Sequence, residues 1–126
     1  MNKRNDKSRK EYTDMKLKEF LEKVDFQIIN MGNDTDIDVT KVFCCDLLSV
    51  AMAKNPAGSV WVTVMGNVNT VAVNVLTEGA CIIFAEGIAP DEMAANKAAS
   101  QGVTMLKTEL PVFEAALAAH KIIQGE

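Results

Sequence analysis

The residues best placed for chemistry lie in the stretch Trp61–Gly79, WVTVMGNVNTVAVNVLTEG. Its pattern predicts a buried strand, a short turn around Gly66 and a helix that ends at Gly79. Such a turn directs helix amide groups and short polar side chains toward one point beyond the end of a strand. Proteins of the α/β class hold small ligands at that point, and a helix N-terminus there favours an anion.

Polar residues also follow the other predicted strands, and the carboxyl ends of parallel strands meet at one edge of a sheet. We expect four loops there, beginning at Gly32, Gly66, Glu86 and Thr108. Asn67 has a second interpretation, because asparagine is a preferred N-cap of its own helix. The predicted ligand-binding residues are Thr63, Gly66, Asn67, Asn69, Thr70, Glu86 and Gly87, with Asp46, Ser49, Thr108 and Glu109 as secondary candidates.

Catalytic chemistry has weaker support in the sequence. Glu86 and Glu109 could place two carboxylates on one edge for acid–base work or a divalent cation, although exposed loop acids are the commoner explanation. The single histidine, His120, lies in the last predicted helix, far in sequence from every loop. A phosphate loop of the GxxxxGK[ST] type and a GxGxxG turn are both absent from the sequence. We therefore predict no catalytic residues, no metal site and no cofactor.

The three cysteines do not change that prediction. Cys44 and Cys45 are adjacent and form no CxxC pair, and Cys81 opens an apolar strand. Metal or redox chemistry is therefore weakly indicated, and Cys81 is expected in the core. The odd number of cysteines predicts no disulfide framework, which suits a reducing compartment.

Helices and strands alternate along the chain with short connections. Capping and breaking residues predict a first helix capped by Thr13 or Asp14, and a second helix capped by Asp46. The later strands are apolar on both faces, as in a parallel sheet covered by helices. The expected fold is a single α/β domain with a mostly parallel sheet of four to five strands. Strands are predicted near 26–29, 37–43, 60–65, 80–85 and 103–106, and helices near 14–24, 46–52, 68–78, 90–101 and 111–123.

Charge separates the N-terminus from the rest of the chain. Residues 1–10 hold five bases and one acid, a net charge of +4, so the total of −4 leaves −8 for residues 11–126. Both arginines, Arg4 and Arg9, lie in this N-terminal segment. An acidic body without arginine disfavours nucleic-acid recognition and weakens a polyphosphate site. We expect a disordered basic tail over 1–13 and a folded domain over 14–126.

Targeting signals are not evident in the sequence. No apolar run approaches the about 20 residues that span a bilayer, and no apolar segment follows the basic start of the chain. A cytoplasmic protein with no membrane partner is the resulting expectation.

Several runs together resemble the DRTGG domain family over about residues 24–123. They are Asp46–Ser49, Trp61–Thr63, Asn69–Val73 and Ile82–Asp91. The resemblance is greatest to small stand-alone members that are similar to HPr serine kinase. It implies an α/β domain like the non-catalytic N-terminal domain of HPr kinase/phosphorylase. Relatives also occur beside CBS domains in some inorganic pyrophosphatases, where the domain dimerises or senses a ligand.

The family's namesake residues are largely replaced in this chain. Asn67-Val68 stands where Asp-Arg would fall, and Ala85-Glu86-Gly87 stands where Thr-Gly-Gly would fall. Many stand-alone relatives also have a histidine in the turn before Asn69, which this chain lacks. Without the arginine, contacts with a phosphate are less favoured than neutral hydrogen bonds or protein contacts.

The sequence leaves three hypotheses about function. The first is a non-catalytic regulatory or ligand-sensing domain, a homodimer that binds a small polar metabolite or nucleotide at the loop edge. The alternative is an interaction adaptor for a metabolic enzyme complex, without a small ligand. A small enzyme that uses Glu86 and Glu109 ranks lower.

Overall fold

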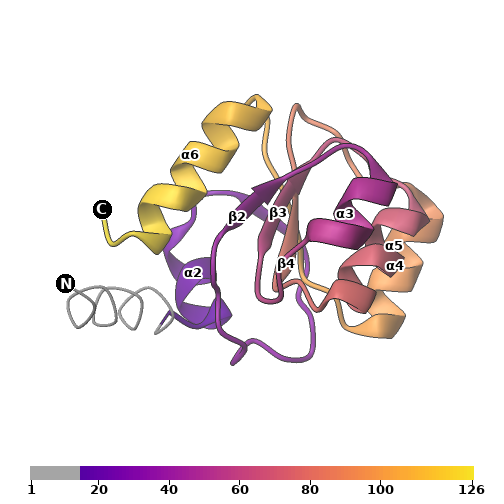
Figure 1. Cartoon of the computed structure of the whole chain (residues 1–126), viewed down its shortest axis with the longest axis horizontal. Coiled ribbons are helices and arrows are strands. Elements are labelled where there is room, and N and C mark those ends of the chain that lie inside the picture. Colours follow the sequence, from indigo (N-terminus) through magenta and orange to yellow (C-terminus); the bar gives the residue numbers. More distant parts are fainter. Residues whose placement is uncertain (1–14) are drawn as a thin grey trace.

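The computed structural model describes residues 15–126 of the chain. The predicted basic tail and the predicted caps Thr13 and Asp14 lie outside these residues. A five-stranded sheet with the order β1-β5-β4-β3-β2 runs through the middle of the domain (Figure 1). This confirms the expected single α/β domain with a mostly parallel sheet. The strands are β1 (Gln27–Asn30), β2 (Val42–Cys44), β3 (Val60–Thr63), β4 (Cys81–Phe84) and β5 (Met105–Lys107).

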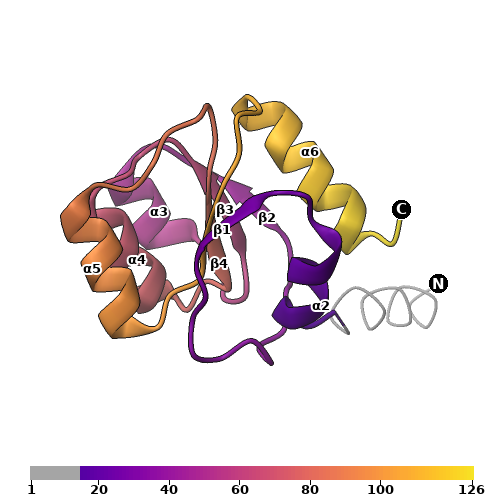
Figure 2. The same ribbon diagram turned by 180° about the vertical axis from the view of Figure 1, so that it is seen from behind.

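Two layers of helices cover the sheet. Helices α2 and α6 lie on one face, and α3, α4 and α5 lie on the other, as both views show (Figures 1 and 2). Strands β2 to β5 pair in parallel, so each passes through a helix before the next parallel strand begins. The helices are α2 (Leu17–Lys23), α3 (Leu48–Lys54), α4 (Val68–Thr77), α5 (Glu92–Gln101) and α6 (Val112–Ile123).

Alternation along the central strands builds two cores. In β3, Val60 and Val62 belong to the cluster with α2 and α6, whereas Trp61 belongs to the cluster with α3, α4 and α5. All four residues of β3 and all four of β4 are buried, which explains their continuously apolar pattern. Trp61 is fully buried, and its indole Nε1 donates to the Cys45 carbonyl oxygen at 3.0 Å.

Strand β1 departs from the parallel arrangement. It pairs with β5 in the antiparallel direction, with Gln27 opposite Lys107 and Asn30 opposite Met105. The loop that follows β1 therefore lies at the edge where β5 begins, and Gly32 N donates to Thr104 Oγ1 at 2.8 Å. The prediction that the Gly32-Asn33-Asp34 loop joins the other three loops is wrong for this reason.

Two helix ends also differ from the predictions. Helix α3 begins at Leu48 with Leu47 as its N-cap and no side-chain capping bond, so the prediction that Asp46 caps it is wrong. Helix α4 ends at Thr77, and its C-cap is Glu78 in the left-handed conformation, one residue before the predicted Gly79. Lys16, the N-cap of α2, makes no side-chain capping bond either.

Candidate functional site

Four loops converge where β2, β3, β4 and β5 end. The loops that follow β4 and β5 pair through their backbones: Glu86 N donates to the Leu110 carbonyl oxygen at 2.8 Å, and Gly87 N to that of Thr108 at 2.9 Å. The loop that follows β3 joins the end of the β4 loop, because Asp91 N donates to Gly66 O at 2.8 Å. The structure thus brings together three of the four predicted loops and adds the one after β2. We call this region the loop edge, comprising residues 45–47, 64–67, 85–91 and 108–111.

Asp46 ties the loop that follows β2 to the end of β3. Its Oδ1 atom accepts a hydrogen bond from Thr63 Oγ1 at 2.6 Å and from Val64 N at 2.9 Å. Thr63 Oγ1 in turn accepts a bond from Met65 N at 3.2 Å. Thr63 is completely buried, whereas Asp46 is exposed. Asp46 is therefore exposed to solvent, while its hydrogen bonds with Thr63 and Val64 fix the position of its carboxylate.

Asn67 caps the helix that follows. Its side-chain oxygen accepts bonds from Asn69 N at 2.9 Å and from Thr70 N at 3.2 Å. This confirms the capping interpretation of Asn67. Two amides that would face an anion at this helix end already have a partner in the protein, so the first turn of α4 is a poor anion cradle.

The other predicted site residues in the turn before α4 and in its first helical turn differ in solvent exposure. Asn69 is exposed, and Thr70 is fully buried. Thr70 Oγ1 has no hydrogen-bond partner among the described residues. Gly66 is needed for packing, since a Cβ there would lie 2.7 Å from the Ala89 carbonyl oxygen. Asn69 can thus contact a surface ligand directly, whereas Thr63 and Thr70 lie beneath the loop edge.

Glu86 and Gly87 form a left-handed pair after β4. Their φ angles are +61° and +73°. This conformation costs a residue with a side chain about 1–2 kcal/mol, and glycine far less. Glu86 Oε2 accepts a long bond, 3.4 Å, from Val112 N at the start of α6, and Glu86 is exposed. The turn places a carboxylate on the surface of the loop edge at a cost in backbone strain.

The secondary candidates Thr108 and Glu109 lie beside this turn. Glu109 Oε2 is 3.8 Å from Lys107 Nζ, and a Cβ at Gly87 would lie 2.6 Å from Glu109 Oε1. Thr108 Oγ1 accepts a bond from Leu110 N at 3.2 Å. Both residues also line a hollow of about 430 Å³ toward β1 with Asp25, Phe26, Gln27, Lys107 and Leu110. Sequence reasoning missed Gln27 and Lys107, because only the antiparallel pairing of β1 with β5 brings them together.

The other groups considered for chemistry either lie away from the centre of the loop edge or are thiols whose pKa is raised. Ser49 is exposed on the first turn of α3, and His120 lies eight residues beyond Val112 in α6, or roughly 12 Å along the helix. Burial raises the pKa of the Cys81 thiol to about 12. Desolvation, followed by the charges of Asp46 and Cys45, raises the pKa of Cys44. Neither thiol is therefore an activated nucleophile near neutral pH.

Charge at the loop edge is mainly negative. Asp46, Glu86, Asp91 and Glu109 all lie at or beside it, with Lys107 as the nearby base that the structure pairs with Glu109. Within residues 15–126, no three histidine, cysteine or acidic side chains cluster closely enough to hold a metal ion. Over the same residues no helix has the length and apolar character to span a bilayer. The loop edge offers hydrogen-bond acceptors more than cationic groups.

Comparison with solved structures identifies a protein with the same fold. The chain is similar to the crystal structure of the CBS and DRTGG domains from the regulatory region of a Clostridium perfringens pyrophosphatase, in complex with its activator diadenosine tetraphosphate. The TM-score is 0.67 at 15% sequence identity, and the match covers 88% of this chain. It covers 47% of the other chain, so the domain corresponds to about half of that regulatory region. At this identity the likeness establishes a shared fold.

Comparisons at the level of sequence added no relative. No model of a known protein family matches the chain. No curated protein matches it either. The DRTGG resemblance therefore rests on the residues quoted above and on the shared fold.

Proposed function

We propose that this chain is a non-catalytic regulatory domain of DRTGG type that senses a small polar ligand at the loop edge. The observation that carries the proposal is that hydrogen bonds join the four loops. They run from Thr63 Oγ1 to Asp46 Oδ1, from Asp91 N to Gly66 O and from Glu86 N to the Leu110 carbonyl oxygen. Loops joined in this way hold the groups that contact a ligand in a fixed arrangement. The described residues of the loop edge include no nucleophile–base pair of the kind that catalysis would use. The similar pyrophosphatase region is regulatory and was crystallised with a nucleotide activator, which supports a sensing role.

The ligand best suited to this edge is neutral and rich in hydrogen-bond donors. Asp46 and Glu86 are exposed acceptors, and the amides of Asn69 and Thr70 are already bonded to Asn67. A nucleoside base and ribose can donate to such acceptors, whereas phosphates would meet negative charge. We therefore propose a nucleoside or a polar metabolite of similar size, with Asn69, Glu86 and Gly87 as surface contacts.

A thermal-shift series tests this proposal on the full chain. Adenosine, AMP, ATP and diadenosine tetraphosphate are compared at equal concentration, and a stabilising ligand raises Tm through its preference for the folded state. We expect adenosine to raise Tm at least as much as the phosphorylated compounds. The variants Asn69→Ala and Glu86→Gln should reduce the shift, and Asn96→Ala, at an exposed asparagine on α5, should not. A flat series with all four compounds would argue against a nucleoside site.

We further propose that the chain forms a homodimer. Strand β2 is an edge strand, and the neighbouring helix α3 exposes apolar side chains at Leu47, Val50 and Met52, at 59%, 37% and 46%. An exposed strand edge beside an apolar patch is a common association surface. Native mass spectrometry should detect a dimer that Val50→Glu converts to monomer, while Glu114→Lys on α6 leaves it intact. A monomer at all concentrations would contradict this part of the proposal.

An adaptor role is the second candidate, supported by a separate apolar patch. Leu110, Phe113 and Leu117 are exposed beside the loop edge, and Phe113 retains 68% of its surface. Aromatic side chains exposed to this extent often anchor partner proteins. Pull-down with the native chain and with Phe113→Ser distinguishes the roles. Loss of one stoichiometric partner in the variant, together with a flat ligand series, would favour the adaptor.

A further inference from the structure

Helix α6 carries an apolar patch on its outer face, next to the loop edge. Phe113 and Leu117 are four residues apart and so lie on one side of the helix, and Leu110 comes just before it. All three side chains are exposed, whereas Ala115 and Ala119 are buried in the core. The helix therefore directs alanines toward the core and Phe113 toward solvent. We call Leu110, Phe113 and Leu117 the α6 patch.

Three carboxylates gather at the start of this patch. Glu109 comes just before it and Glu114 lies within it, and both are exposed. The contact of Glu86 Oε2 with Val112 N, at 3.4 Å, brings a third carboxylate to the same end of α6. Lys107 pairs with Glu109 at 3.8 Å, whereas within residues 15–126 no ion pair engages Glu86 or Glu114. The start of the patch is therefore negatively charged.

The basic residues of α6 lie at its other end. His120 and Lys121 are in the last turn of the helix. Lys121 lies eight residues beyond Phe113, which is roughly 12 Å along the helix axis. Charge on the outer face thus changes from negative to positive along α6. Because like charges repel across an interface, a partner that covers the α6 patch needs basic side chains over the start of α6.

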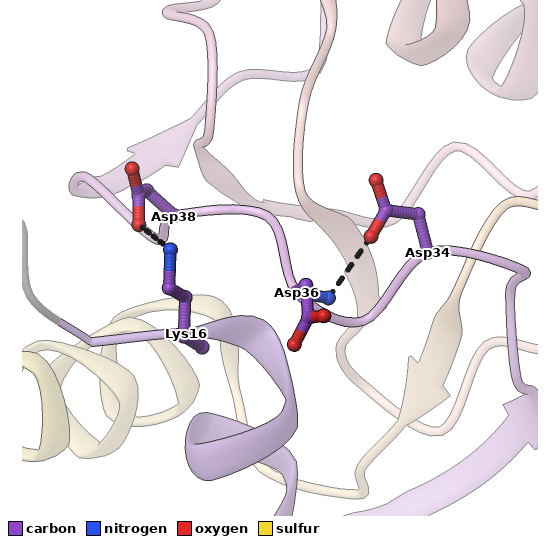
Figure 3. A network of polar contacts seen from close by, with 4 residues as sticks. All are labelled: Lys16, Asp34, Asp36 and Asp38. Carbon is purple, nitrogen blue, oxygen red and sulfur yellow. Dashed lines mark hydrogen bonds and ion pairs between the residues drawn. The ribbon is translucent and has the colours of Figure 1, made fainter.

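A second acidic segment of the described chain has no such apolar surface. Asp34, Asp36 and Asp38 lie in the loop that follows β1. Figure 3 shows that Asp38 pairs with Lys16 Nζ at 2.8 Å and that Asp34 Oδ1 accepts a bond from Asp36 N at 3.0 Å. Among residues 15–126, no large apolar side chain between positions 34 and 38 is exposed. Exposed apolar side chains and acids outside ion pairs thus occur together at α6 and not at this loop.

From these observations we propose that the α6 patch docks an amphipathic helix of a partner protein. Lysine or arginine side chains at one end of that helix lie over Glu109 and Glu114. Phe113 and Leu117 belong to a ridge of residues four apart, which packs into the groove of a second helix, and an exposed aromatic residue is a common anchor. The patch spans about two helical turns, so the contact is small and suits a transient complex.

This inference rests on the adaptor role proposed above and specifies the chemistry of its partner. The basic segment 1–10 of the chain itself is a poorer match, because Met1 is its only large apolar residue. A second copy is assigned above to β2 and α3, on the far side of the sheet from α6. A basic helix from another protein is therefore the occupant that both the apolar spacing and the charge of α6 favour.

The experiment compares two labelled peptides that differ in charge. The first is a short alanine-rich helix with leucines at spacings of three and four residues and lysines in its last two turns. In the second, glutamates replace the lysines. Fluorescence anisotropy with the full chain should give a Kd for the lysine peptide that is lower by about ten-fold or more. Higher salt should reduce that ratio, because exposed charges are screened. Equal affinities for the two peptides would overturn the proposal.

Variants at exposed positions locate the binding. Phe113→Ser should weaken binding of the lysine peptide by about ten-fold, whereas Leu76→Ser, at an exposed leucine on α4, should not. Glu114→Lys should weaken the lysine peptide and strengthen the glutamate peptide. This reversal cannot arise from a difference in helicity between the peptides. Glu22→Lys, at an exposed acid on α2, should change neither affinity.

The possible outcomes separate this inference from the adaptor role. A lysine peptide that binds Phe113→Ser as tightly as the native chain contacts another surface, and this would overturn the inference. A partner lost from the Phe113→Ser pull-down, when neither peptide binds, would keep the adaptor role and reject the basic helix. Conversion of the dimer to monomer by Glu114→Lys in native mass spectrometry would assign the α6 patch to a second copy and reject it as well.

Discussion

Thr63 Oγ1 donates a 2.6 Å hydrogen bond to Asp46 Oδ1 and thereby links the loop after β2 to the last residue of β3. The same carboxylate oxygen accepts from Val64 N at 2.9 Å. One acidic side chain thus accepts hydrogen bonds from the last residue of β3 and from the residue that follows it. Because Thr63 is buried and Asp46 is exposed, the pair connects the interior of the sheet to the surface of the loop edge.

Breaking this link should lower the free energy of unfolding. Asp46→Ala leaves the buried Thr63 hydroxyl and Val64 N without their acceptor, which predicts a loss of about 1–3 kcal/mol. Thr63→Val combined with Asp46→Ala should cost less than the sum of the single changes, because the two residues share one bond. Urea unfolding of the four proteins measures the coupling. Asp25→Ala, at an exposed acid, is the control, and strict additivity would show that the bond contributes nothing.

Capping by Asn67 predicts a different mutational pattern at the start of α4. Asn67→Ala should destabilise the fold by about 1 kcal/mol, whereas Asn67→Asp should retain most of the stability because aspartate caps equally well. Asn69→Ala should change stability by less than about 0.5 kcal/mol, since Asn69 is exposed. Thermal and urea unfolding provide the comparison. A loss in Asn67→Asp as large as in Asn67→Ala would contradict the capping role.

Relief of strain at Glu86 should separate stability from binding. Glu86→Gly removes a side chain from a residue with φ +61°, and we expect a gain of about 1 kcal/mol. The same change deletes the exposed carboxylate of the loop edge, so the proposed ligand shift should shrink. The reverse experiment is Gly87→Ala, which should destabilise the chain at φ +73°. A destabilised Glu86→Gly protein would mean that the bond to Val112 N outweighs the strain.

Burial of Cys81 predicts a loss of stability at high pH. Desolvation raises the pKa of its thiol from the ordinary value of 9.0 to about 12 in the folded chain. Between these values the unfolded state releases the proton while the folded state retains it, so unfolding becomes more favourable as pH rises. The contribution is complete below pH 9 and declines by up to about 1.4 kcal/mol per pH unit above it.

The measurement compares the pH dependence of the native chain with that of Cys81→Ala. Every other titratable group is common to the two proteins, so the difference between the two curves isolates the Cys81 thiol. We expect the native curve to fall more steeply between pH 9 and 12. Parallel curves would indicate that Cys81 titrates in the folded protein as it does in the unfolded chain.

Part of the fold and of the loop edge could be predicted from local patterns. The continuous apolar runs Val60–Thr63 and Cys81–Phe84 require burial on both faces, and helices on both sides of a parallel sheet provide it. Asn67 caps its helix as its residue type indicates, and its side-chain oxygen accepts from a first-turn amide. These features depend on interactions within a few residues, which the sequence displays directly.

Contacts between distant segments could not be predicted in the same way. The local rule assigns Asp46 to a helix cap, but its Oδ1 atom accepts hydrogen bonds from Thr63 Oγ1 at the end of β3 and from the backbone N of Val64, which follows it. The direction of β1 is equally hidden, because a four-residue strand has the same apolar pattern in either direction. Its pairing with β5 then moves the Gly32 loop to the far edge of the sheet.

The sequence by itself therefore determined the α/β class, the order of the elements and the turn at Gly66, since short-range patterning and capping dictate them. Tertiary structure alone decided which loops meet, the left-handed conformations of Glu78 and Glu86, and the exposure of Phe113 on α6. These depend on strand order and on packing between residues far apart in the chain. A site assembled from several loops is visible only after those long-range contacts are fixed.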